Sequence, residues 1–220
     1  LSWSGGKDSA MALYELQKQG YSDITLLTTV SEKYGRISMH GVRETLLTEQ
    51  ARSLGLNIEK IYLSPECTNE EYGAKMEEFM LRQKKRGIKK AAFGDIFLED
   101  VRKYREKNLE KHEIDAVFPL WGRKTKEIAE TFIGLGFKSI ITCVDTNSLD
   151  KSFSGRLFDR DLLSDLPRNV DPCGENGEFH SFVFDGPIFS QKIEFSAADK
   201  LFDDGRFCFC DLKSANGVFL

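Results

Sequence analysis

The chain has 220 residues, 40% hydrophobic and 30% charged, a composition typical of a folded, water-soluble protein of one or two domains. Its net charge of −4 argues against general affinity for nucleic acid, and it has no apolar run of membrane-spanning length. The five cysteines form neither a CxxC pair nor a dense disulfide framework, so we expect a reducing, cytoplasmic compartment.

The first predicted element is a short apolar strand that leads through a glycine-rich loop into a helix. Adjacent glycines let backbone N–H groups approach a phosphate chain, and the following helix directs its positive end at the same anion. The loop is Ser4, Gly5, Gly6, Lys7, Asp8 and Ser9. Asp8 stands where a Walker A loop has Ser or Thr, and its carboxylate can hold Mg²⁺ or cap the helix. An ordinary strand-to-helix turn is the alternative interpretation.

Strand and helix patterns then alternate at short spacing. Strands are predicted at 24–30, 58–63, 91–94 and 116–118, and helices at 45–54, 69–86 and 98–111. Asn69 is the expected N-cap of the second of these helices. Repeated strand–helix units of this length indicate an α/β, Rossmann-like parallel sheet whose ligand binds at the carboxyl ends of the strands.

The sequence changes character near Trp121. One helix is predicted at 124–135, and strands at 139–144, 179–184, 192–195 and 206–212. We therefore expect residues 1–121 to form a nucleotide-binding domain and residues 122–220 a smaller α+β substrate domain.

Two further stretches bring polar side chains to the expected ligand edge. His40 and Arg43 follow the second strand, where they either face the nucleotide or belong to a solvated helix entry. Gly94 and Asp95 end another strand, where glycine permits close approach of a ligand and Asp95 can contact ribose or metal.

The helix after Asp95 carries Arg102 and Arg105 on one face. Arginines that reach a polyphosphate would stabilise the charge that develops on departing pyrophosphate. The alternative is a solvated face of ion pairs with Glu99 and Glu106.

A second dense motif, Asp-Pro-Cys-Gly-Glu-Asn-Gly-Glu-Phe-His, occupies residues 171–180. Glu175 and Glu178 are candidates to bind an amine, a metal or a protonated substrate group, and His180 is a candidate general base. A structural Gly-Asn turn before a strand is the alternative.

Together these motifs resemble the PP-loop (N-type) ATP pyrophosphatases and, within them, the diphthine–ammonia ligase family. The matching motifs, in the family's order, are Ser4–Ser9, His40–Arg43, Gly94–Ile96 with Arg102 and Arg105, Pro119–Trp121 and Glu175–His180. The resemblance implies ATP and Mg²⁺ as cofactors. It implies that an acceptor oxygen is adenylated with release of pyrophosphate, and that ammonia then displaces AMP to form an amide. Lys7, Asp8, Glu175, Glu178 and His180 are the implied catalytic residues.

One departure bears on the acceptor. The diphthine-acting members resemble Glu-Gly-Gly-Glu-Tyr/Phe-Glu in the second loop, whereas this chain has Asn176 and His180 at two of those positions. The variant resembles a mostly bacterial branch linked to cobalamin metabolism. The acceptor, a small molecule or a modified residue, therefore stays open, as does the oligomeric state, with a homodimer as one option. A nucleotide sensor without turnover is the alternative function.

Overall fold

A computed structural model describes residues 1–37, 40–203 and 205–215, without the side chains of residues 198–203. Ser38 and Met39, inside the predicted His40 stretch, lie outside the described residues. The elements of the first half are α1 (Lys7–Lys18), β1 (Thr25–Ser31), β2 (Arg36–Ile37), α2 (Glu44–Leu54), β3 (Asn57–Leu63), α3 (Asn69–Lys85), β4 (Lys90–Ala92), α4 (Glu99–Glu110) and β5 (Asp115–Val117). Those of the second half are α5 (Thr125–Gly134), β6 (Lys138–Asp145), a 3₁₀ turn (Lys151–Phe153), α6 (Arg160–Asp165), β7 (Phe179–Asp185), β8 (Phe195–Asp203) and β9 (Phe207–Ser214).

The first half is built on a parallel sheet. β1 pairs in parallel with β3, and β4 with β5. The first three residues join these pairs, because the Ser2 N–H donates to the Ala92 carbonyl at 2.9 Å and the Trp3 N–H to the Leu27 carbonyl at 2.7 Å. The predicted α/β, Rossmann-like class is therefore confirmed. The glycine-rich loop follows directly after residues 1–3, at the carboxyl end of this central segment of the sheet.

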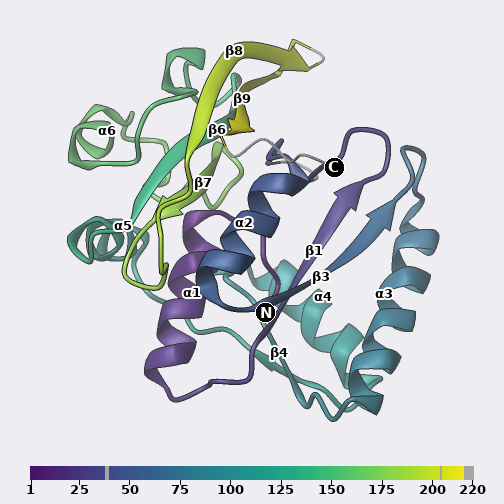
Figure 1. Cartoon of the computed structure of the whole chain (residues 1–220). Helices are drawn as coiled ribbons and strands as arrows, with labels where there is room; N and C mark the ends of the chain where they lie inside the picture. Colours follow the sequence, from purple (N-terminus) through teal and green to yellow (C-terminus); the bar gives the residue numbers. More distant parts are fainter. Residues whose placement is uncertain (38–39, 204, 216–220) are drawn as a thin grey trace.

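The second half is an antiparallel sheet with strand order β7-β6-β9-β8. Figure 1 shows α1 and α2 on the side of this sheet that faces the parallel sheet, and α5 and α6 on its other side. A hydrogen bond from the Val183 N–H to the Gly5 carbonyl, 2.9 Å long, ties β7 directly to the glycine-rich loop.

One hydrophobic cluster runs through both halves. Trp3, Met11 and Leu47 of the first half belong to the same buried cluster as Phe132 and Phe182 of the second. Trp121 lies in the segment between β5 and α5. The division at residues 121 and 122 stays a prediction, and the two halves share one core.

The structure corrects three local predictions. Thr68, not Asn69, caps α3, because the Thr68 backbone is extended and its hydroxyl accepts a hydrogen bond from the Glu71 N–H at 3.1 Å. The strand predicted at 192–195 begins only at Phe195, and the short helix α6 falls between the predicted strands at 139–144 and 179–184, where no helix was predicted. In the described part of the chain, no helix is both long and apolar enough to cross a membrane.

Candidate functional site

The glycine-rich loop ends where Gly6 caps α1 with extended backbone. Gly5 has φ +78°, and a Cβ there would lie 2.6 Å from the Leu47 side chain. A Cβ on Gly6 would lie 3.0 Å from the Ser181 carbonyl. Close packing therefore requires glycine at both positions, and the left-handed backbone conformation requires it at Gly5 as well. The Ser9 hydroxyl donates to the Gly6 carbonyl at 2.8 Å and fixes the first turn.

Gln50, a residue that the motifs do not single out, holds this loop from behind. Its side chain is fully buried and accepts a hydrogen bond from the Trp3 indole N–H at 2.9 Å. Its amide donates to the Gly5 and Val183 carbonyls at 3.0 and 2.5 Å. One amide side chain therefore connects α2, the glycine-rich loop and β7. A buried amide in an apolar helix face was the only sequence signal for it.

Lys7 points from the loop into the second half of the chain. Its side chain is almost fully buried, and its ammonium contacts both carboxylate oxygens of Asp8, at 3.0 and 2.8 Å, and the Cys173 carbonyl. The ammonium also lies 5.4 Å from the centre of the Phe179 ring. Burial opposes the charge on Lys7, but Asp8 outweighs it, so the pKa of Lys7 is raised.

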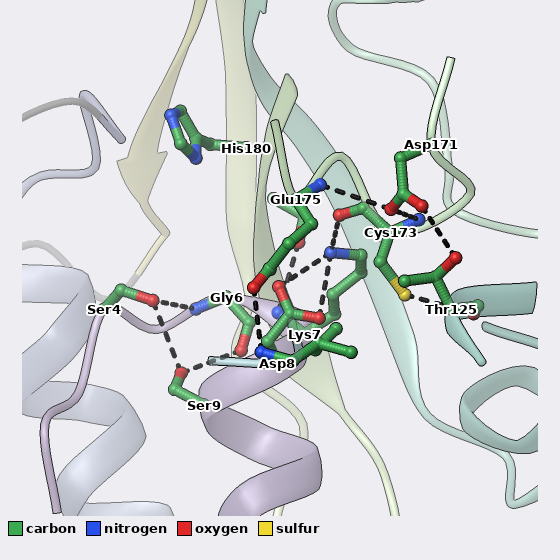
Figure 2. A network of polar contacts seen from close by, with 12 residues as sticks. Ser4, Gly6, Lys7, Asp8, Ser9, Thr125, Asp171, Cys173, Glu175 and His180 are labelled. Carbon is green, nitrogen blue, oxygen red and sulfur yellow. Dashed lines mark hydrogen bonds and ion pairs between the residues drawn. The ribbon is translucent and has the colours of Figure 1, made fainter. Parts of the chain in front are cut away.

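The loop at 171–178 is held in shape by its own carboxylates. Glu178 is buried and accepts hydrogen bonds from the N–H groups of Asp171 and Asn176, each at 3.0 Å. Asp171 in turn accepts one from the Thr125 hydroxyl at 2.6 Å (Figure 2). Glu178, predicted to be catalytic, therefore holds the backbone of its own loop in shape through these hydrogen bonds.

Glu175 has a different environment from Glu178. Its carboxylate crosses to the first half and accepts a hydrogen bond from the Ile96 N–H at 2.8 Å. Burial raises the pKa of Glu175 to about 7, and the Ile96 hydrogen bond only partly offsets this. Glu175 is therefore poised to exchange a proton near neutral pH.

His40 and His180 lie together over the glycine-rich loop. Their ring centres are 4.3 Å apart, and a Cβ on Gly6 would lie 3.4 Å from His40 Cε1. Burial lowers the pKa of both rings, that of His180 to about 4. Both imidazoles are therefore neutral at pH 7. His40 Nδ1 is buried and has no hydrogen-bond partner among the described residues, so it is a donor or acceptor left for a ligand.

The turn after β4 closes the same site. A Cβ on Gly94 would lie 3.0 Å from the Asp8 carbonyl, so only glycine lets this turn approach the start of α1. Asp95 pairs with Arg105 at 2.7 Å, and the Arg105 guanidinium stacks 4.3 Å from the centre of the Phe93 ring.

The structure separates two other predicted residues from this group. Arg102 bonds to Glu106 at 2.7 Å and stacks on Trp121, which matches the alternative of an ion-pair face. Arg43 forms a bidentate pair with Asp211 of β9, at 3.0 and 2.7 Å. Their roles as nucleotide ligands stay predictions.

A cavity of about 470 Å³ opens beside the glycine-rich loop and extends along the sheet under α3. Its lining includes Ser4, Thr28, His40, Phe93, Arg105 and His180. The lining combines hydroxyls, imidazoles and a guanidinium with apolar side chains such as Leu27 and Met76, a mixture that suits an amphipathic anion with a flat aromatic part.

Comparisons with known proteins relate both halves of this chain to one family. Residues 1–114 match the family model described as the diphthamide synthase N-terminal domain, and residues 124–218 match that of the diphthamide synthase C-terminal domain. The diphthine–ammonia ligase of Mus musculus is 25% identical over 215 residues, which cover 86% of this chain and 79% of the mouse protein. That of Homo sapiens is 24% identical, with the same coverage. A solved structure of a predicted tRNA methyltransferase subunit from Methanocaldococcus jannaschii is 18% identical, with TM-score 0.44, covering 83% of this chain and 93% of that one.

Proposed function

The chain belongs to the diphthamide synthase family, and on that basis we propose that it is an ATP-dependent, AMP-forming ligase that makes an amide from ammonia and an acid. The observation that carries the proposal is the direct contact between its two motif loops. Lys7 of the glycine-rich loop bonds to the Cys173 carbonyl, and Glu175 of the second loop bonds back to Ile96. The two motif loops are thus in direct contact, which supports a phosphate cradle on the glycine-rich loop and a proton-exchanging carboxylate on its neighbour.

In the proposed reaction, an acceptor oxygen attacks the α-phosphorus of ATP. The bond from this phosphorus to the bridging oxygen breaks, and pyrophosphate leaves with the electron pair. Ammonia then attacks the activated carbon, AMP departs, and the attacking nitrogen loses a proton. We propose that Glu175 takes that proton, a role supported by its pKa of about 7, which leaves much of it ionised near neutral pH.

The chain's contribution to ATP binding divides between the loop and the cavity. We propose that the backbone N–H groups at the start of α1, with the hydroxyls of Ser4 and Ser9, hold the phosphates. The apolar part of the cavity, with Phe93, receives the nucleoside. Both carboxylate oxygens of Asp8 contact Lys7, so Mg²⁺ would take most of its ligands from the triphosphate and at most one from Asp8.

The acceptor is proposed by class only. His180 is neutral because burial lowers its pKa to about 4, and the Glu178 carboxylate is occupied by its own loop. These two positions therefore provide little negative charge for a fixed cation such as the trimethylammonium of diphthine. This supports an acid without that cation, including acids of cobalamin-related metabolism. A cytoplasmic location and a homodimer stay expectations.

The proposal is tested with purified protein, Mg-ATP and ¹⁵N-ammonium, offered a panel of diphthine-bearing and cation-free acids. The expected result is ¹⁵N in the amide of at least one cation-free acid, detected by mass spectrometry. Tight ATP binding without label in any product would favour the nucleotide sensor instead.

A further inference from the structure

Lys7 is the residue that a phosphate-binding loop would most simply use as its cation, yet its ammonium is already occupied. Both oxygens of Asp8 and the carbonyl of Cys173 receive its N–H groups, and the rings of Phe158 and Phe179 lie within 5.8 Å. An ammonium has three donors, and these contacts use them.

The direction of the side chain separates Lys7 from the cradle. Figure 2 shows Ser4 and Ser9 on one side of the start of α1, and the Lys7 ammonium on the other, beside Cys173 and Glu175. Ser4 lines the cavity next to the loop, whereas Lys7 is not among the described residues that do so.

Turning Lys7 towards the cradle would break buried contacts on both sides. The Asp8 carboxylate would lose its cation, and the Cys173 carbonyl would lose its donor inside the protein. Removing one member of a buried ion pair leaves an uncompensated charge, which is strongly unfavourable. The arrangement is thus a stable holding contact for the loop at 171–178.

We propose that Lys7 is a positioning residue, which holds the 171–178 loop against the start of α1 and does not bind phosphate. Arg105 lines the cavity while it pairs with Asp95 and stacks on Phe93, and in this proposal it is the cation that contacts the nucleotide there. The inference rests on the proposed function in one respect, namely that the bound nucleotide is ATP. It is tested by nucleotide binding and hydrogen exchange. The inference can therefore fail while ligase activity is found, and it can hold while no ligase activity is found.

The first experiment compares Lys7→Met with Arg105→Met as a matched loss of one cation. Binding of α,β-methylene-ATP is measured by calorimetry, and protection of residues 171–178 by hydrogen exchange. In Lys7→Met we expect affinity within about 3-fold of wild type and exchange in the loop faster by about 10-fold or more. In Arg105→Met we expect affinity lower by about 10-fold or more and unchanged loop protection. The reverse pattern would overturn the proposal.

The second experiment needs no variant that must fold. In wild-type protein, α,β-methylene-ATP is added and exchange at residues 171–178 is followed. If Lys7 stays on Cys173, exchange there is unchanged or slower. If Lys7 moves to the phosphates, the loop loses its holding contact and exchanges faster, which contradicts the proposal. A third experiment uses Lys7→Ala: propylammonium replaces the missing atoms and is expected to restore loop protection, whereas sodium is not.

Discussion

Glu175 in the second half accepts a hydrogen bond from the backbone N–H of Ile96 in the first half, and the two atoms are 2.8 Å apart. Lys7 reaches in the opposite direction, from the first half to the Cys173 carbonyl. These reciprocal contacts hold the second loop against the glycine-rich loop and the turn after β4, so changes in either loop are expected to affect turnover in the proposed reaction.

Replacing Glu175 by Gln separates its hydrogen bond from its proton transfer. The amide oxygen of Gln still accepts from Ile96, but the side chain no longer takes a proton. We expect amide formation to slow by about 100-fold with nearly unchanged ATP affinity, as typical for loss of a general base. Single-turnover rates and calorimetry check this. Wild-type rates in Glu175→Gln would exclude Glu175 as the base.

The pH dependence of stability is expected to contain two opposing contributions. Burial lowers the pKa of His180 to about 4, so the unfolded chain binds a proton that the folded site refuses, and acidification from pH 6.5 to 4 destabilises the fold. Burial raises the pKa of Glu175 to about 7, so its contribution is present below pH 4.5 and is lost as pH rises through 7.

Removing either group should therefore change, in a defined direction, how much the Tm falls between pH 7 and pH 5. Glu175→Gln is expected to lose more Tm than wild type between pH 7 and pH 5, and His180→Asn to lose less. Thermal unfolding at the two pH values measures both. A shift of both variants in the same direction would show that these groups do not govern the dependence.

Gln50 is expected to matter for stability although it belongs to none of the sequence motifs. Gln50→Leu would leave the buried Trp3 indole N–H without its acceptor and would remove the Gln50 donor from the carbonyls of Gly5 and Val183, of which Gly5 keeps the Val183 N–H. We expect unfolding to become easier by about 2–4 kcal/mol, since each buried unsatisfied group costs roughly 1–3 kcal/mol. Exposed Gln17 of α1 provides the control, and Gln17→Leu should change stability by less than about 0.5 kcal/mol.

Arg43 is expected to support the fold through Asp211. Burial alone would raise the pKa of Asp211, but hydrogen bonds from Arg43 and Arg36 outweigh it and hold the pKa at about 2. The stabilisation is therefore present above pH 4 and is lost as pH falls through 2. Asp211→Asn should lower stability at pH 7 by about 1–3 kcal/mol. Urea unfolding measures this, and an Asp211→Asn protein as stable as wild type would show that the pair contributes little.

Much of the fold was predictable because local patterns determine it. Alternating apolar runs and helix signals predicted the parallel sheet and placed the glycine-rich loop at its carboxyl edge. Gly55 ends α2 in the left-handed conformation that favours glycine. The cap of α3 was misassigned because Thr68 and Asn69 are both good capping residues, and only the backbone shows which is extended.

The site was less predictable, since side-chain partners depend on tertiary contacts. Sequence spacing could not show that the Glu178 carboxylate accepts hydrogen bonds from its own loop. It also could not show that Arg43 pairs with Asp211 of β9, 168 residues away. Nor could it show that Lys7 points away from Ser4. Each of these outcomes is decided by which buried partner lies nearest after the two halves pack together.

The proposed function requires that the chain cleave ATP between the α- and β-phosphates to drive amide formation. The nucleotide products are followed by chromatography when Mg-ATP, ammonium and an accepted acid are mixed with the protein. We expect AMP and pyrophosphate in equal amounts, dependent on both acid and ammonium. Formation of ADP and phosphate, or of no cleavage product while ATP binds tightly, would contradict the proposed function.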